Sequence, residues 1–216
     1  MSTPSATLFI VDDDEEVRRS LARLLRSVGY MTRAFSSAAD FLVNYDSAGA
    51  GCIILDLAMP GLSGLELQQC LSATGCHRPI IFLTGNGDIT TSVRAMKAGA
   101  VNFLTKPVDD RDLFAAVEEA LAIDIAERAA WRARHSVYER LATLTPRERQ
   151  VMEHVVAGRL NKQVAGELGT AEKTVKVHRA RVMRKMRARS LAELVKLAGL
   201  VGIQSADSSE LEQCRH

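Results

Sequence analysis

Five polar residues stand at the ends of short apolar segments in the first half of the chain. They are Asp12 and Asp13 after residues 8–11, Asp56 after residues 52–55, Thr84 after residues 80–83 and Lys106 after residues 101–104. Continuous apolar runs of this length are typical of strands buried on both faces of a parallel sheet. In open sheets of this kind, ligands bind at the carboxyl ends of the strands. We therefore expect three carboxylates, a hydroxyl and an ammonium to meet in one crevice.

Three carboxylates in one crevice point to a divalent cation. Their negative charges repel one another, and a hard cation with oxygen ligands, Mg²⁺ or alternatively Mn²⁺, offsets that repulsion. Asp56 can then act as a nucleophile and form an aspartyl phosphate, with the metal and a lysine offsetting charge on the phosphoryl oxygens. The acidic run 12–16 has an alternative explanation as a solvated helix N-terminus. We accept that explanation for residues 14–16 but not for Asp12 and Asp13, which directly follow a predicted strand.

The elements that position these residues alternate between strand and helix. The first intervening stretch has an apolar face made of Val17, Leu21, Leu24, Leu25 and Val28. Their spacing is that of one helical face, and Gly29 supplies the stop. A weaker strand at residues 30–35 completes five β-α units. Repeated β-α alternation predicts an α/β fold with a doubly wound, five-stranded parallel sheet and right-handed crossovers.

The motifs IVDDDEE, ILDLAMPGLSG, FLTGNGD and VNFLTKP resemble the receiver domain of response regulators, over residues 5–122. The resemblance implies a flavodoxin-like, CheY-like fold and phosphorylation of Asp56 by a sensor histidine kinase. It further implies that Mg²⁺ is held by Asp13, Asp56 and the backbone carbonyl of Ala58, with Asp12 acting largely through water.

The same resemblance assigns the remaining residues of the crevice. Thr84 and Lys106 would contact the phosphoryl group, and the bond between Lys106 and Pro107 would be cis. Phe103 matches the aromatic residue that receivers turn inward on phosphorylation, with a shift of the Thr84 hydroxyl opening the space. The alternative is that Phe103 is a core or interface residue of the last strand, where aromatics are common. Residues 88–121 form the surface through which such receivers usually pair.

The two parts of the chain differ in charge and are joined by a helical stretch. Residues 1–125 carry 10 basic and 16 acidic residues, a charge of −6, whereas residues 126–216 carry 18 and 10, a charge of +8. This asymmetry indicates a signalling half joined to a polyanion-binding half. We expect a receiver at 1–122 and a semi-rigid helical linker at 123–140, rich in strong helix formers. The apolar residues Ile123, Ile125, Trp131 and Val137 form no sustained heptad, so we expect no long coiled coil.

The second half has the pattern of a helix-turn-helix. Thr145, Pro146 and Glu148 supply an N-cap, a proline at the first helical position and a capping box. After Gly158, Asn161 is expected to cap a short helix closed by Gly169, and a third helix begins near residue 171.

Residues 173–189 hold eight basic residues and no acidic one, while Val175, Val182 and Met186 recur on one face. Such a run is often only a solvated face, but its position after a glycine turn indicates a recognition helix for the DNA major groove.

Residues 141–200 also resemble the LuxR-type output domain of FixJ/NarL response regulators. This implies a four-helix domain within 141–203, in which Lys176 and Val177 face bases. The residues assigned to phosphates are Lys173, Thr174, Arg181, Arg184 and Lys185. Ala180 replaces a base-reading lysine found in some members, and Ala171 replaces a capping serine or threonine, so we expect Thr170 to cap the recognition helix. We expect the polar tail 204–216 to be disordered.

These observations together predict a two-component response regulator. It would be phosphorylated on Asp56, form a homodimer through its receiver, bind double-stranded promoter DNA and act on RNA polymerase. The rival from the enzyme class is a phosphatase or phosphotransferase with an aspartyl nucleophile, which Asp12-x-Asp14 superficially suggests. Glu16, however, stands where Thr or Val is expected two residues after the second Asp. Beyond phosphotransfer and self-dephosphorylation we expect no enzymatic activity. The other alternative is a phosphorylation-independent DNA-binding regulator whose receiver only dimerises.

Composition and termini give the expected location. No stretch approaches the roughly 20 apolar residues of a membrane span, and residues 1–14 lack the basic and apolar regions of a secretion signal. We therefore expect a cytoplasmic protein with no membrane partner. The four cysteines have no C-x-x-C spacing, which predicts reduced, structural thiols.

Overall fold

The computed structural model describes residues 6–46, 49–76, 78–85 and 89–203. The chain divides into two compact units, Met1–Arg128 and Ala129–His216. The expected disordered tail 204–216 lies outside the described residues.

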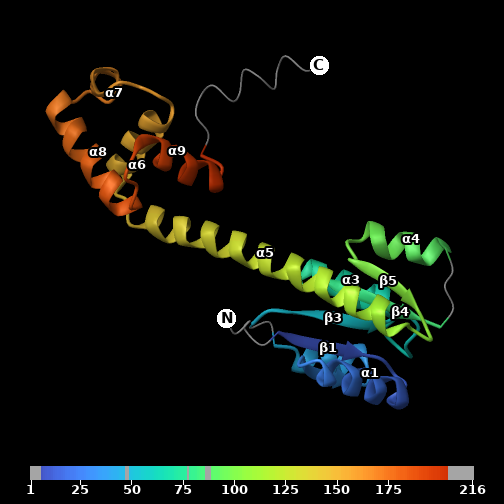
Figure 1. Ribbon diagram of the computed structural model, residues 1–216. Helices are drawn as coiled ribbons and strands as arrows, with labels where there is room; N and C mark the ends of the chain where they lie inside the picture. Colours follow the sequence, from blue (N-terminus) through green and yellow to red (C-terminus); the bar gives the residue numbers. More distant parts are fainter. Residues whose placement is uncertain (1–5, 47–48, 77, 86–88, 204–216) are drawn as a thin grey trace. The chain divides into compact units, whose positions relative to one another are not determined.

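The first unit is built on a five-stranded parallel sheet (Figure 1). Its strands are β1 (Thr7–Val11), β2 (Met31–Phe35), β3 (Gly51–Asp56), β4 (Ile80–Thr84) and β5 (Asn102–Thr105). The helices between and after them are α1 (Glu15–Ser27), α2 (Ala38–Asn44), α3 (Gly64–Ala73), α4 (Ile89–Lys97) and α5 (Asp110–Ala142). The order β2-β1-β3-β4-β5 reverses direction at β1, so the predicted doubly wound sheet is confirmed.

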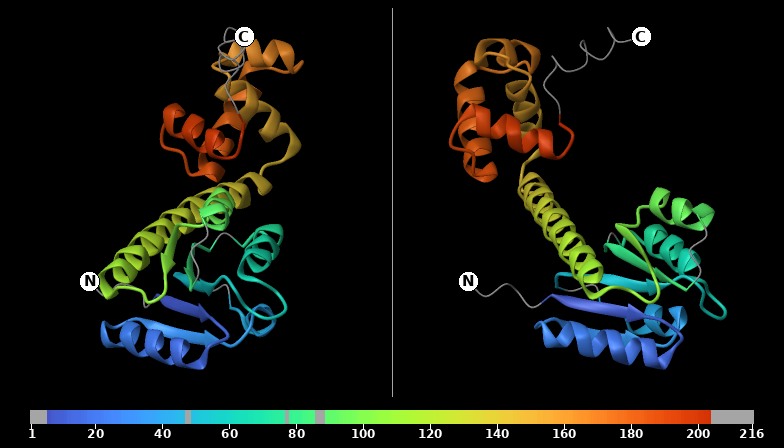
Figure 2. Two further views of the ribbon diagram at one scale, coloured as in Figure 1. Left: turned by 90° about the vertical axis from the view of Figure 1, so that its right-hand side faces the viewer. Right: turned by 45° about the vertical axis from the view of Figure 1, so that its right-hand side comes forward.

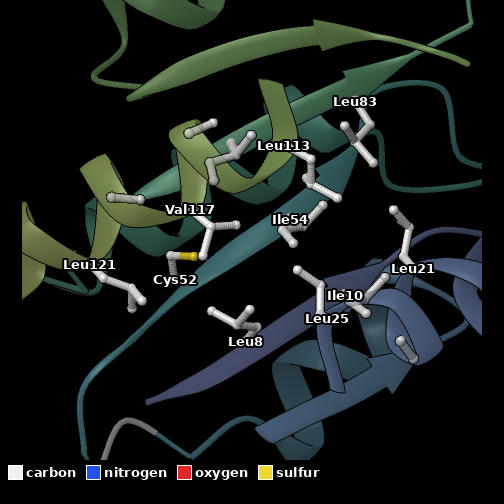
Figure 3. Close-up of a cluster of buried hydrophobic side chains, with 14 residues drawn as sticks. Leu8, Ile10, Leu21, Leu25, Cys52, Ile54, Leu83, Leu113, Val117 and Leu121 are labelled. Atoms are coloured by element: carbon white, nitrogen blue, oxygen red, sulfur yellow. The ribbon is translucent and has the colours of Figure 1, made fainter. Parts of the chain in front are cut away.

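Alternate residues of the strands build two cores, one on each face of the sheet. On one face, Leu8, Ile10 and Ile54 pack against α1 and α5, as Figure 3 shows. On the other face, Phe9 and Phe82 pack against residues of α2, α3 and α4. The central strands are buried on both sides, which explains their continuous apolar sequences.

The second unit is a small helical domain with its own core. Its helices are α6 (Pro146–Val156), α7 (Asn161–Glu167), α8 (Glu172–Met186) and α9 (Leu191–Leu200), coloured from dark yellow to red in Figure 2. Val137 and Leu141 from the end of α5 join this core. Asp124, earlier in α5, instead belongs to the first unit, where its buried carboxylate accepts a hydrogen bond from the Gly51 backbone at 3.0 Å.

The predicted N-cap is confirmed for one helix of the second unit and is wrong for two. The Thr145 hydroxyl and the Glu148 carboxylate form the predicted capping box of α6. Asn161, however, does not cap α7; the N-cap is Leu160, whose backbone N–H donates to the Gln163 side chain at 2.7 Å. Ala171 is the N-cap of α8 and no side chain caps this helix, so the expectation for Thr170 was wrong.

Candidate functional sites

Three carboxylates gather at the carboxyl edge of the sheet. Asp12 and Asp13 follow β1, and Asp56 is the last residue of β3. One oxygen from each lies within 4.8 Å of the others, the spacing of groups that can share a metal ion. Asp12 and Asp56 are buried, whereas Asp13 is exposed. The cluster is therefore open to solvent on the side of Asp13.

Lys106 joins the cluster from the segment after β5. Its ammonium lies 2.6 Å from Asp12 Oδ2 and 2.8 Å from Asp56 Oδ1. Burial lowers the pKa of Lys106, but the hydrogen bonds and charges of the two aspartates outweigh burial and raise it. The lysine thus stays charged, and the Lys106–Pro107 bond that follows is cis, as the resemblance implied.

Backbone groups hold the two buried aspartates in place. Asp56 Oδ2 accepts a hydrogen bond from Ala58 N at 3.2 Å, and Asp12 Oδ1 accepts one from Asp14 N at 2.9 Å. Burial raises the pKa of Asp12 more than the hydrogen bonds from Lys106 and Asp14 lower it. A neutralising cation would therefore be favoured beside this carboxylate.

Thr84 and Phe103 lie on the neighbouring strands. Thr84 ends β4 and is buried, one residue after Leu83, which pairs with Asp56 in the sheet. Its carbonyl accepts a hydrogen bond from Lys106 N at 2.7 Å. Phe103 on β5 is half-buried, with its ring centroid 6.4 Å from that of Phe82. This position suits both interpretations of Phe103, the switch and the packing residue.

Arg18 is a residue of this site that the sequence did not reveal. Its guanidinium donates to the backbone carbonyl of Asp12 at 2.7 Å from the first turns of α1. Asp14, which caps α1 through hydrogen bonds to Glu16 N and Val17 N, fixes the start of that helix. An arginine at a helix start carries no sequence signal for a backbone contact, so only the structure could identify it.

The recognition helix presents most of its predicted DNA contacts to solvent. Val175, Val182 and Met186 of α8 are buried in the core of the second unit. The exposed residues are Lys173, Thr174, Lys176, Val177, Arg181 and Arg184. Because the anchored face is apolar and the free face basic, the helix can meet a polyanion while remaining fixed to its domain.

Lys185 differs from the other predicted DNA contacts. Its ammonium lies 2.6 Å from Glu148 Oε2 and donates to the Thr143 carbonyl at 2.8 Å. Glu148 is 2% exposed. Hydrogen bonds from Lys185 and from the Thr145 backbone lower the pKa of Glu148 to about 2. Lys185 thus links α8 to α6 through an ion pair. The basic run in the sequence did not indicate this role.

Comparison with known proteins identifies both units. Residues 8–118 match the response regulator receiver domain, and residues 142–198 match the bacterial regulatory proteins of the luxR family. Nodulation protein W of Bradyrhizobium diazoefficiens is 48% identical over 212 residues, which cover 98% of this chain and 93% of that protein. The chain belongs to the FixJ/NarL-type response regulators.

Further relatives of this response regulator agree. FixJ of Azorhizobium caulinodans is 46% identical over 205 residues, covering 95% of this chain and 97% of that protein. The solved structure of the response regulator StyR is 46% identical and covers 90% of this chain and 98% of its own, with a TM-score of 0.82. The predicted family and fold class are therefore confirmed, and the protein is a transcriptional response regulator with a kinase partner and a DNA-binding domain.

Membrane association was expected to be absent from this response regulator. Within the part of the chain that the structure describes, no helix combines the length and the apolar character needed to cross a bilayer.

Proposed function

We propose that Asp56 of this response regulator accepts a phosphoryl group from a phosphohistidine of its sensor kinase. The observation that carries the proposal is the pairing of a buried carboxylate with a charged lysine: Asp56 is 4% exposed and lies 2.8 Å from Lys106 Nζ. The Lys106 ammonium would bind an oxygen of a phosphoryl group attached to Asp56, because it already lies where negative charge would develop.

The acidic cluster suits a hard divalent cation, Mg²⁺ or Mn²⁺. Its donors are carboxylate oxygens that come within 4.8 Å of one another, the ligand type that these ions prefer. Asp13, Asp56 and the backbone carbonyl of Ala58 would hold the ion, with Asp12 acting largely through water. When bound, the ion would offset negative charge on the phosphoryl oxygens.

The protein residues then carry out the transfer. An oxygen of Asp56 forms a bond to phosphorus as the bond from phosphorus to the histidine nitrogen breaks, and the electron pair of that bond returns to the imidazole. Lys106 moves from the Asp56 carboxylate to a phosphoryl oxygen, and the Thr84 hydroxyl donates a hydrogen bond to another. Beyond this transfer and self-dephosphorylation, the protein has no enzymatic activity.

Phosphorylation controls a homodimer. The shift of Thr84 opens space into which Phe103 turns, which changes the surface of α4, β5 and the first turns of α5. Val93 and Met96 on α4 are 45% and 46% exposed and supply apolar area for the pairing. The dimer binds two half-sites of promoter DNA, the arrangement expected of helix-turn-helix dimers, and acts on RNA polymerase from there.

DNA contact is made by the free face of α8. Lys176 and Val177 face the bases, and the exposed basic residues of the helix contact phosphates. Ala180, which is exposed, supports an apolar contact to a thymine methyl group in place of a charged one. The ion pair of Lys185 with Glu148 favours a supporting role for this lysine.

The proposal is tested by the intact mass of the full chain after incubation with acetyl phosphate and Mg²⁺. We expect one phosphoryl adduct, its absence in Asp56→Asn and in chelator, and a shift to dimer in size-exclusion chromatography. Asp109→Asn, an exposed carboxylate outside the acidic cluster, is the matched control and should be modified normally. An adduct that persists in Asp56→Asn would show that another residue is the acceptor.

A further inference from the structure

One face of α5 in the second unit carries an exposed aromatic stripe. Trp131 and Tyr138 are 59% and 55% exposed, and His135 lies between them with its ring stacked on Trp131, the centroids 4.8 Å apart at 9°. Val137 and Leu141, on another side of the same helix, are buried in the domain core. The stripe therefore does not belong to this core. Large aromatics exposed in a row mark a surface that meets a partner.

The spacing of the stripe is that of a coiled-coil seam. Trp131, His135 and Tyr138 are separated by four and three residues, an average of 3.5, which is the heptad period with the aromatics at the inner positions. The residues that flank such a seam, at the g position and at the e position five residues later, face each other between parallel copies. Here they are Arg134 and Glu139, which carry opposite charges and are both exposed.

Charge complementarity of this kind favours a second copy of the same chain as the occupant. In a parallel, in-register pair, Arg134 of one copy faces Glu139 of the other, and symmetry makes the contact twice. An unrelated partner surface would not require opposite charges at these two positions.

We propose that residues 131–139 of α5 pair in parallel with the same segment of a second copy within the phosphorylated dimer. This inference rests on the proposed function, because so short a helical pairing is marginal by itself. Pairing of the receivers would supply the effective concentration that the segments need. The aromatic contact lies directly before α6, so it would couple receiver pairing to the alignment of two DNA-binding domains on paired half-sites.

Charge exchange tests the pairing in the phosphorylated full chain. We expect Arg134→Glu and Glu139→Arg each to raise the dimer dissociation constant by on the order of tenfold, because like charges then face each other. The double variant R134E/E139R should restore the wild-type constant, since the opposite charges are exchanged but still meet. Ala133→Glu, on the exposed outer side of the same helix, is the control and should leave the constant unchanged. Sedimentation equilibrium measures the dimer dissociation constant of all four variants.

Trp131 gives an independent readout because it is the only tryptophan of the chain. Its fluorescence emission should shift to the blue on phosphorylation, in step with dimer formation as protein concentration rises, and not in Asp56→Asn. A shift that does not depend on concentration would mean that the stripe is covered within one chain, which overturns the pairing.

The outcomes separate this inference from the proposed function. A phosphorylated wild type that dimerises while all charge variants behave alike contradicts the pairing and leaves receiver dimerisation intact. A phosphorylated wild type that stays monomeric at every concentration contradicts the dimer itself, and the pairing is lost with it.

Discussion

Lys106 offsets only part of the charge of the buried carboxylates, because its single ammonium is shared between Asp12 and Asp56. Asp12 and Asp56 lie within 2.8 Å of it, while the exposed Asp13 forms no ion pair with Lys106 in the described part of the chain. The negative charge that remains is the driving force for binding a metal ion. The stability of the protein should therefore depend on Mg²⁺.

We expect Mg²⁺ to raise the melting temperature of the wild type. An ion that binds only the native state at ten times its dissociation constant stabilises it by about 1.4 kcal/mol. Asp13→Asn should lose most of this response because a charged ligand is removed, whereas Asp14→Asn should keep it, since asparagine also caps helices and Asp14 caps α1. Scanning calorimetry with Mg²⁺ and with chelator measures the effect. An equal response in both variants would exclude the acidic cluster as the ion site.

Glu148 and Lys185 predict a second residue-scale effect, on the acid stability of the DNA-binding domain. The pKa of Glu148 is lowered from 4.5 to about 2 in the folded protein. The stabilisation is complete above about pH 4.5 and is lost as the pH falls towards 2, because the unfolded state binds the proton first. Glu148→Gln should thus melt below the wild type at pH 7, with the difference shrinking from pH 4.5 to pH 2.

The same pair has a matched control on α8. Lys185→Met leaves a buried carboxylate without its partner and should cost about 3 kcal/mol at pH 7. Lys176→Met removes an exposed ion pair with Glu172 and should cost less than about 1 kcal/mol. Circular dichroism melts of the full chain distinguish the two. Similar losses in both variants would contradict the role of Lys185 in linking α8 to α6.

Among the helix starts, the sequence predicted the cap that depends only on residues close together in the chain. The capping box of α6 needs only Thr145 and Glu148, three residues apart, and was confirmed. The caps of α7 and α8 were wrong because the backbone enters these helices at Leu160 and Ala171, whose side chains accept no hydrogen bond. Residue type favours a cap but does not determine where the backbone turns into the helix.

Contacts between residues far apart in the sequence also include some that can be predicted and some that cannot. The meeting of Lys106 with Asp12, 94 residues away, was predictable because parallel strands bring their carboxyl ends to one edge. The contact of Lys185 with Glu148, 37 residues away, depends on the angle at which two helices pack. No periodicity in the sequence specifies that angle.

Alanine substitutions at two glycines, each in a helix, are expected to change the stability of the protein in opposite directions. A Cβ at Gly64, the first residue of α3, would lie 2.3 Å from the Asp56 carbonyl oxygen, a backbone atom that cannot yield easily. Gly64→Ala should therefore destabilise the receiver by about 2 kcal/mol and lower phosphorylation of Asp56. Gly166→Ala in α7 meets no atom within 4 Å and should stabilise by about 0.5–1 kcal/mol. Thermal melts check both signs, and a tolerated Gly64→Ala would contradict the close approach.

At the scale of the whole molecule, the sequence separated two functions by charge and the structure assigns each to a compact unit. The negative first part contains the acidic crevice, and the positive second part contains α8. The boundary between the units lies within one helix, since α5 runs without a break from Asp110 to Ala142. Its sequence gives no sign that Asp124 bonds to Gly51 in the first unit while Val137 packs in the second. Uniform helix formers specify a helix but not which domain each turn contacts.

We propose that phosphorylation of Asp56 governs DNA binding by the second unit. The affinity of the full chain for a duplex obtained by selection from random sequence tests this proposal. The measurement should compare wild type and Asp56→Asn, each with and without acetyl phosphate, at one fixed salt concentration. We predict that phosphorylation tightens binding by at least about tenfold, or 1.4 kcal/mol, in the wild type alone. Equal affinity in all four samples would contradict the claim and favour a regulator whose receiver only dimerises.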